Sequence, residues 1–441
     1  MDRVLLKDLG QHIGKMVSVA GWVSVRRDQG KMVFFDFRDR TGSVQGVVLP
    51  SEELAMAVAK EVRPEYVVRV SGLVNKRPDK NINPDVQNGN IELQVQSIEV
   101  LSKAEIPFEL GAEVNLDTQL DHQPYTLRSE RSKKIFKVQE SLVRAFRAAM
   151  RAQDFTEFQA PAIVGGDAEG GAAAFEVGYY YDQKAYLATS PQLYKQIMVG
   201  VFERAFATPK IFRAEKHSTS RHLPEYTSMD FEMGFIGDHT DIMLSLENAI
   251  RAMCLAVSEE HPDIFAHFGT TAPLLPEKIP VLKLREAQKI LGASQVEPDL
   301  EPEQERALCE WANKEHQSDF VFVTHYPVKK RPFYTYEDEA DPGYTKSFDL
   351  LFRGLEITTG GQRIHNYDKL VSNIREWKLD PEKFKFYLEA FRVGMPPHGG
   401  SATGLERITA RMLNLPNVKE ATLFPRDLNR IDTLLSTDKK D

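Results

Sequence analysis

Cysteine is scarce in this chain, and long apolar runs are missing. Cys254 and Cys309 are the only cysteines among 441 residues, and they show no C-x-x-C spacing. This argues against a disulfide framework or a thiolate zinc site and suits a reducing compartment. No apolar stretch reaches the about 20 residues that a membrane-spanning helix needs, and the first residues lack the apolar core of a signal peptide. We therefore expect a cytoplasmic protein that does not associate with membranes.

Two further absences limit how the chain can bind phosphates. The formal net charge is −8, so there is no overall basic surface, although a local basic patch can still bind nucleic acid. The sequence contains no G-x-x-x-x-G-K-[ST] loop and no strand-linked G-x-G-x-x-G. If the protein uses ATP, it must hold the phosphates with side chains.

Residues 1–104 carry a series of short segments in which apolar and polar residues alternate. These segments lie at residues 17–23, 32–37, 43–48, 66–72 and 91–100. Turn-forming residues separate them, such as the sequence Asp39-Arg-Thr-Gly. Five short strands with such turns predict a small closed barrel of the OB-fold type. The apolar periodicity over residues 54–62 predicts the helix that would plug it.

The rest of the chain has a different pattern. Residues 105–131 lack sustained periodicity and predict a linker or hinge. Residues 132–441 predict a second domain of the α+β class, which begins with helical spacing over Ser132–Ala152. A helical middle follows from about residue 240 to residue 316, and apolar strands follow it. We expect a mostly antiparallel sheet rather than a βαβ array.

The most informative segment is a charge-rich hairpin over residues 212–232. Arg213 and Glu215 are two apart on a predicted strand and so share one face. A polar loop with Arg221 and His222 follows, and the chain returns as a strand on which Tyr226, Ser228, Asp230 and Glu232 alternate. Such a hairpin could close over an anion, or it could be an ordinary charged surface hairpin.

A second segment, residues 394–407, is rich in small residues. Its glycines would let a strand lie close to a ligand before a helix that carries Glu406 and Arg407. Taken alone, it also fits a simple strand-to-helix turn.

Together the two segments resemble motifs 2 and 3 of class II aminoacyl-tRNA synthetases, with F-R-x-E, R-H-x-x-E-[FY]-T-x-x-D-x-E and G-x-E-R. Residues 132–158 and Pro161 resemble motif 1, which lies at the dimer interface.

The resemblance covers almost the whole chain and is strongest to aspartyl-tRNA synthetases of subclass IIb. It implies an N-terminal OB-fold that binds the anticodon and an antiparallel six-stranded sheet flanked by helices. The chain is too short for the large extra domain of the bacterial enzymes and resembles the compact archaeal type. The implied reaction is ATP-dependent activation of L-aspartate and its transfer to tRNA-Asp by a homodimer. Enzymes of the compact type often have a relaxed specificity for tRNA, so we predict that tRNA-Asn is charged as well.

The resemblance also implies roles in binding ATP. Arg213 resembles the arginine that holds the α-phosphate and stabilises the transition state, and Arg407 resembles the motif 3 arginine on the γ-phosphate side. Tyr226 would stack on adenine, and Glu215 would accept from its amino group. Arg221 and His222 would lie at the phosphates. Asp349, Glu356 and Thr359 match the family's Mg²⁺ site, since hard carboxylates suit that ion; Asp349 and Glu356 could otherwise be surface carboxylates.

Selection of aspartate over asparagine requires cations at the side-chain carboxylate. By resemblance, Lys195 and Arg363 supply them, Asp230 orients Lys195, and Gln192 lies near the α-amino group. Glu169 resembles the acid of the loop that closes over the ammonium. Asparaginyl enzymes usually lack the lysine at position 195, which makes it the discriminating residue.

In the barrel, the resemblance assigns the anticodon to Arg27, Phe34 and Gln45. An exposed aromatic ring can stack on an unpaired base. Phe34 and Phe35 alternate, so one ring must enter the barrel core, and the pattern alone does not say which.

Some residues depart from the family. Ala402 and Ser401 replace a usual glycine and a usual aromatic of motif 3, and residues 125–128 differ from the usual Tyr-Leu-Asp-Leu-Arg.

Three alternative functions remain open. One is an asparaginyl-tRNA synthetase, and another is a paralog that makes free asparagine, although those known lack the barrel. The third is a non-catalytic RNA-binding relative, which would tend to lose Arg213, Glu356 and Arg407.

Overall fold

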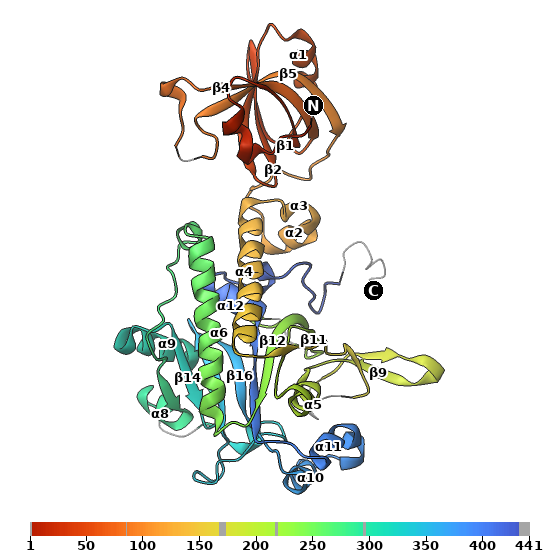
Figure 1. Cartoon of the computed structure of the whole chain (residues 1–441), viewed down its shortest axis with the longest axis vertical. Helices are drawn as coiled ribbons and strands as arrows, with labels where there is room; N and C mark the ends of the chain where they lie inside the picture. The colour runs from red at the N-terminus through yellow and green to blue at the C-terminus, as the bar shows by residue number, and fades with distance from the viewer. Residues whose placement is uncertain (1, 85, 167–172, 217–218, 294–296, 432–441) are drawn as a thin grey trace. The chain divides into compact units, whose positions relative to one another are not determined.

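The computed structural model describes residues 2–84, 86–166, 173–216, 219–293 and 297–431. It divides into two compact units, Met1–Glu113 and Val114–Asp441 (Figure 1). The segment between Ser102 and Leu116 contains no helix or strand. The remainder of the predicted linker forms two short helices, α2 (Leu116–Asp121) and α3 (Gln123–Thr126), and the first residues of a long helix that begins at Glu130. Helices of six and four residues are too short to give a periodic pattern, so the sequence did not predict them.

The first unit is a closed five-stranded barrel with strand order β1-β2-β3-β5-β4. Its strands are β1 (Met16–Gln29), β2 (Met32–Asp39), β3 (Gly42–Val48), β4 (Val67–Lys76) and β5 (Ile91–Ser102). β3 and β5 pair in parallel, and β4 pairs with β1 to close the barrel. The helix α1 (Glu53–Glu61) lies between β3 and β4 in the chain and buries Ala55 and Ala59, together with the flanking Val62, in the barrel core. This topology confirms the predicted OB-fold.

The second unit is built on a sheet with the order β13-β14-β15-β16-β17-β12-β10-β6, and β11 pairs with β12 at its side. The six strands from β14 to β10 are all antiparallel to their neighbours, whereas the edge strands β13 and β6 pair in parallel. The strands are β6 (Thr156–Glu157), β10 (Arg204–Ala207), β11 (Lys210–Phe212), β12 (Glu225–Gly234), β13 (Val281–Lys283), β14 (Phe320–Thr324), β15 (Ser347–Phe352), β16 (Leu355–Arg363) and β17 (His398–Gly404). The predicted α+β fold with an antiparallel sheet is confirmed.

Helices cover both faces of this sheet. The long helices α4 (Glu130–Ala152) and α6 (His239–Glu260) lie side by side, and with α12 (Leu405–Met412) they bury the main core against one face (Figure 1). Phe320 and Phe322 of β14 point into this core, whereas Val321 and Val323 point to α8 (Leu284–Ile290) and α9 (Pro302–His316) on the other side. Successive side chains of this strand point to opposite faces of the sheet and therefore pack in two different cores.

Three further helices and a small sheet complete the second unit. Helices α5 (Gln192–Phe202) and α11 (Lys385–Arg392) pack against each other, and α10 (Tyr367–Glu376) joins α11 in a smaller aromatic core. A small sheet of β7 (Ile163–Val164), β9 (Lys184–Leu187) and β8 (Glu176–Gly178) precedes α5. The predicted helical middle also contains α7 (Ile264–His267) and is interrupted by the strand β13.

Candidate active site

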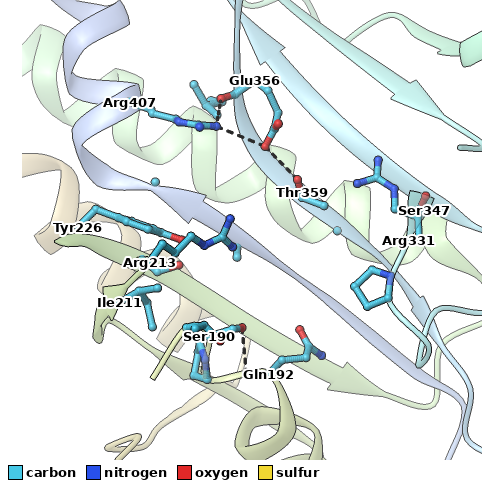
Figure 2. Close-up of a pocket in the computed structure, with 18 of the residues that line it drawn as sticks. Ser190, Gln192, Ile211, Arg213, Tyr226, Arg331, Ser347, Glu356, Thr359 and Arg407 are labelled. Atoms are coloured by element: carbon cyan, nitrogen blue, oxygen red, sulfur yellow. Dashed lines mark hydrogen bonds and ion pairs between the residues drawn. The ribbon is translucent and has the colours of Figure 1, made fainter. Parts of the chain in front are cut away.

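A cavity of about 490 Å³ opens on the face of the sheet opposite to α4 and α6. Side chains from α5, β12, β16, β17 and α12 line it (Figure 2). It brings together ten of the residues that the sequence placed in one site: Gln192, Lys195, Arg213, Arg221, His222, Tyr226, Glu356, Thr359, Arg363 and Arg407. Segments that are far apart in the sequence thus meet at one hollow.

A row of four residues in register across four strands runs past the cavity, and two of them, Thr359 and Ala402, line it. Asp230 of β12 pairs with Ala402 of β17, Ala402 pairs with Thr359 of β16, and Thr359 pairs with Asp349 of β15. Since side chains at paired positions point to the same face, the sheet places two carboxylates and a hydroxyl in one row. Ala402, which replaces a usual glycine of motif 3, lies in the middle of that row and lines the cavity.

Lys195 is the most deeply buried cation of the site, with 1% of its surface exposed. Its Nζ donates to Asp230 Oδ1 at 2.9 Å and to the carbonyl oxygen of Ser401 at 3.1 Å. Glu232 Oε2 lies 3.4 Å from the same nitrogen without a hydrogen bond. An ammonium has three donors, and these two hydrogen bonds use two of them.

Glu232, to which the sequence assigned no role in the site, joins Lys195 to Arg363. Arg363 Nε donates to Glu232 Oε1 at 2.9 Å, and an NH2 group of Arg363 donates to the carbonyl oxygen of Gly400 at 2.9 Å. Burial opposes the ionisation of Glu232, but Arg363 and Lys195 outweigh it and hold the pKa of the Glu232 carboxyl below its usual range. A side chain on Gly400 would reach within 2.2 Å of Glu232 Oε2, so the glycine leaves room for this carboxylate.

The predicted metal ligands lie on the hairpin of β15 and β16. Asp349 Oδ2 accepts from Arg331 at 2.8 Å, whereas Asp349 Oδ1 is buried without a hydrogen-bond partner. Glu356 Oε1 accepts from the Thr359 hydroxyl at 2.9 Å. Burial and the nearby charge of Glu356 hold the pKa of Asp349 above its usual range. Arg331, which also packs 3.9 Å from the centre of the Tyr326 ring, was not predicted as a site residue.

Another part of the cavity lining is formed by Arg213, Tyr226 and Arg407. The guanidinium carbon of Arg213 lies 5.9 Å from the centre of the Tyr226 ring. Arg407 donates to the backbone oxygen of Glu356 at 3.0 Å and lies 3.5 Å from its carboxylate. In Figure 2, Arg213 and Arg407 border the same open space. Two cations and an aromatic ring around a hollow can bind a phosphorylated ring compound.

Not every predicted nucleotide-binding residue is placed as the sequence suggested. The strand β11 ends at Phe212, so Arg213 and Glu215 follow the strand rather than sharing a face within it, and Glu215 does not line the cavity. Arg221 forms an ion pair with Glu305 of α9. Glu305 was not predicted from the sequence as a site residue. Burial raises the pKa of Glu305 to about 7, although Arg221 opposes this. His222 is exposed and bonds to Thr219 at 2.7 Å, and Glu169 lies outside the described residues.

In the barrel, the structure decides which phenylalanine is internal. Phe35 is fully buried and stacks on Phe37 at 5.4 Å, whereas Phe34 lies on the outer face and is partly exposed. Phe34 pairs across the strands with Arg27, whose guanidinium is held by Asp36 at 2.9 and 3.0 Å. Asp36 in turn pairs with Gln45. The three residues assigned to the anticodon therefore lie on one face, and Arg77 donates to Gln45 Oε1 at 2.8 Å.

Comparison with known proteins identifies the two units. The family described as tRNA synthetases class II (D, K and N) matches residues 115–428, and an OB-fold nucleic acid binding domain matches residues 17–101. The chain belongs to the class II tRNA synthetases. As a member of that family, this synthetase is an ATP-dependent aminoacyl-tRNA ligase with a tRNA-binding OB-fold.

Several relatives are similar over nearly their whole length. An aspartate–tRNA(Asp/Asn) ligase of Thermus thermophilus is 46% identical, with 97% of this chain and 99% of the relative covered. An aspartate–tRNA(Asp) ligase of Thermoplasma acidophilum is 36% identical, with 98% of this synthetase and 100% of the relative covered. The solved asparaginyl-tRNA synthetase of Pyrococcus horikoshii, complexed with asparaginyl-adenylate, has a TM-score of 0.89 at 32% identity and covers 98% of this chain and 99% of its own. Within the described residues of the synthetase, no helix has the length and apolar character needed to cross a membrane.

Proposed function

We propose that this synthetase activates L-aspartate with ATP and transfers it to tRNA-Asp and also to tRNA-Asn. The observation that carries the proposal is the pair of buried cations, Lys195 and Arg363, in the same cavity as Arg213. The solved asparaginyl enzyme shares the fold, so the fold alone does not choose the amino acid. The choice rests on the hydrogen-bond donors that the two cations present to a ligand.

Asp230 and Glu232 balance the two cations in charge, so the preference for an anionic side chain rests on the N–H donors that Lys195 and Arg363 present to a ligand. Asp230 and Glu232 orient the two cations, and Lys195 keeps one N–H donor for a ligand. A carboxylate can accept that donor and a guanidinium N–H together, as charge-assisted hydrogen bonds. The amide of asparagine has only one acceptor oxygen, and its NH2 group would bring a donor against the N–H donors of the two cations. Aspartate is therefore the expected substrate.

The reaction needs two displacements in this cavity. An oxygen of the aspartate α-carboxylate bonds to the α-phosphorus of ATP, and pyrophosphate leaves with the electron pair of the broken bond. A hydroxyl of the terminal tRNA adenosine then attacks the carbonyl carbon, and AMP leaves. Arg213 would stabilise charge on the α-phosphate, Arg407 would hold the terminal phosphates, and Tyr226 would stack on the adenine. Their position around one hollow supports these roles.

Asp349 and Glu356 are suited to hold Mg²⁺ with the help of Thr359. The buried Asp349 Oδ1 has no hydrogen-bond partner, and two oxygen ligands beside a phosphate site match the preference of this ion. No group of three or more histidine, cysteine or carboxylate side chains that could hold a metal occurs among the described residues. The phosphates of ATP would therefore complete the coordination. When bound, Mg²⁺ would neutralise charge on the phosphates.

We also propose that the outer face of the barrel binds the anticodon and that the enzyme is a cytoplasmic homodimer joined through motif 1. Phe34 supplies a partly exposed ring, and Arg27 and Gln45 lie beside it. The wider tRNA range is supported by the 46% identical relative that is named for both tRNAs.

Aminoacylation of purified tRNA-Asp and tRNA-Asn with labelled aspartate tests this function. We expect both RNAs to be charged, tRNA-Asn within about tenfold of the rate for tRNA-Asp, a difference of about 1.4 kcal/mol. Charging of tRNA-Asp alone would restrict the enzyme to one tRNA. Failure to charge either one with aspartate would disprove the proposal.

A further inference from the structure

Behind the amino-acid pocket lies a chain of buried polar side chains, of which only Gln192 has a part in the proposed reaction. Gln192 of α5 lines the cavity, and Gln196, one helical turn later, lies behind it. His398 of β17 and Tyr387 of α11 complete the group. The exposed fractions are 4% for Gln192, 1% for Tyr387 and zero for Gln196 and His398. Each polar atom here must find its partner within the protein.

The hydrogen on the imidazole of His398 can be assigned from its neighbours. Its Nδ1 lies 2.9 Å from the carbonyl oxygen of Pro396, which can only accept, so Nδ1 carries the hydrogen. Burial lowers the pKa of His398 to about 4, and the ring is neutral at neutral pH. Its Nε2 therefore has a free lone pair and acts as an acceptor.

This assignment fixes the amide of Gln196. Gln196 Nε2 lies 2.9 Å from His398 Nε2 and must donate to it, so Gln196 Oε1 points away from the histidine. The oxygen accepts from Gln192 Nε2 at 3.0 Å and from the Tyr387 hydroxyl at 3.2 Å. The reversed amide would place NH2 groups of Gln196 and Gln192 against each other and leave His398 Nε2 facing an oxygen.

The amide of Gln192 is fixed in turn. Because its nitrogen donates to Gln196, its oxygen must face the cavity, where an NH2 group of Arg363 lies 3.4 Å away. An α-ammonium group has only donors, and it can bind this side chain only through the oxygen.

We propose that the Pro396 carbonyl sets the orientation of the Gln192 amide through His398 and Gln196, so that an acceptor faces the α-ammonium of the substrate. We call this chain the amide relay. His398 and Gln196 are positioning residues, because they touch no substrate. The inference rests on the proposed aspartate activation, in which Gln192 lies near the α-amino group.

The test compares two tight-binding ligands that differ in the ammonium alone. One is aspartyl-sulfamoyl adenosine, and the other is its succinyl counterpart without the α-amino group. Gln196→Met removes the relay at similar volume. We expect it to weaken the aspartyl ligand about 10- to 100-fold, the effect of one unmade charged hydrogen bond, and to leave the succinyl ligand within about twofold. Gln196→Glu keeps an acceptor toward Gln192 and should retain most of the binding.

Two reference variants separate the possible failures. Tyr387→Phe removes one hydroxyl from the relay and should weaken the aspartyl ligand about three- to fivefold more than the succinyl ligand. It therefore still tests the relay if Gln196→Met does not fold. Gln192→Ala reports on the assigned role of Gln192 itself. Equal weakening of both ligands by Gln196→Met and Tyr387→Phe, or no weakening, would overturn the relay. If Gln192→Ala also failed to distinguish the ligands, the assigned placement of aspartate in the pocket would be wrong as well.

Discussion

Lys195 Nζ lies 2.9 Å from Asp230 Oδ1, and at most 1% of either side chain is exposed. Replacing the lysine alone would leave a buried carboxylate without this cation, which typically destabilises a protein by about 3–5 kcal/mol. The double variant Lys195→Met with Asp230→Asn removes both charges together. We expect its melting temperature to lie within a few degrees of that of the wild type. Its rate of aspartate-dependent ATP–pyrophosphate exchange should fall at least about 100-fold, or about 3 kcal/mol. Near-normal exchange in a folded double variant would remove Lys195 from the substrate pocket.

Phe34 and Phe35 offer a test of the barrel surface. Phe34→Ala should lower kcat/KM for tRNA by about 10- to 100-fold, because stacking on one base is worth about 1–3 kcal/mol. The rate of aspartyl-adenylate formation should not change, since the cavity proposed to bind the amino acid and ATP lies in the other unit. Charging assays and exchange assays on the same preparation give both values. Unchanged charging would show that the exposed ring does not contact the anticodon.

The ion pair between Arg221 and Glu305 predicts a role for α9 in binding ATP. A guanidinium has five donors, so Arg221 can pair with Glu305 and still reach a phosphate. Glu305→Gln should raise KM for ATP about tenfold, or about 1.4 kcal/mol, with little change in KM for aspartate. Glu303→Gln is the matched control, because Glu303 pairs with Arg306 on the exposed side of the same helix. An unchanged or lower KM for ATP in Glu305→Gln would contradict a positioning role.

His239 at the start of α6 predicts a pH dependence of stability. Burial lowers its pKa from 6.5 to about 4, and its Nδ1 is buried without a hydrogen-bond partner. Because the unfolded chain binds the proton more readily, this residue stabilises the fold above pH 6.5, and the contribution is lost as pH falls toward 4. Between pH 8 and pH 5 the loss should be about 2 kcal/mol. In urea unfolding, the free energy of unfolding of His239→Gln should change by about 2 kcal/mol less between pH 8 and pH 5 than that of the wild type.

The control for this measurement is His316→Gln, since His316 is exposed at the end of α9. It should keep the pH dependence of the wild type. If His239→Gln also kept it, the buried histidine would not be neutral in the folded protein.

The sequence predicted the fold well because the barrel strands alternate cleanly and motif residues recur at fixed spacing. It predicted Lys195, Asp230 and Arg363 for one pocket, and the structure brings them together around Glu232. Glu232 itself was not assigned, because a carboxylate on an alternating strand ordinarily faces solvent. Its burial depends on α5 and on the glycine at position 400, which are distant in the chain.

Two other features could not be derived from local pattern. Glu305 belongs to a charge-rich helix whose sequence is typical of an exposed surface, and only the packing of α9 against the sheet brings it to Arg221. The orientation of the Gln192 amide depends on His398, whose hydrogen is set by a backbone carbonyl. Such relationships follow from tertiary contacts, whereas hydrophobic periodicity reports on secondary structure.

The most direct test of the central claim, that this pocket selects a carboxylate, is ATP–pyrophosphate exchange with L-aspartate and with L-asparagine on the wild-type protein. We predict exchange with aspartate and a kcat/KM for asparagine at least about 1,000-fold lower, which corresponds to about 4 kcal/mol. Exchange that was equal for both, or faster with asparagine, would show that Lys195 and Arg363 do not hold the substrate side chain.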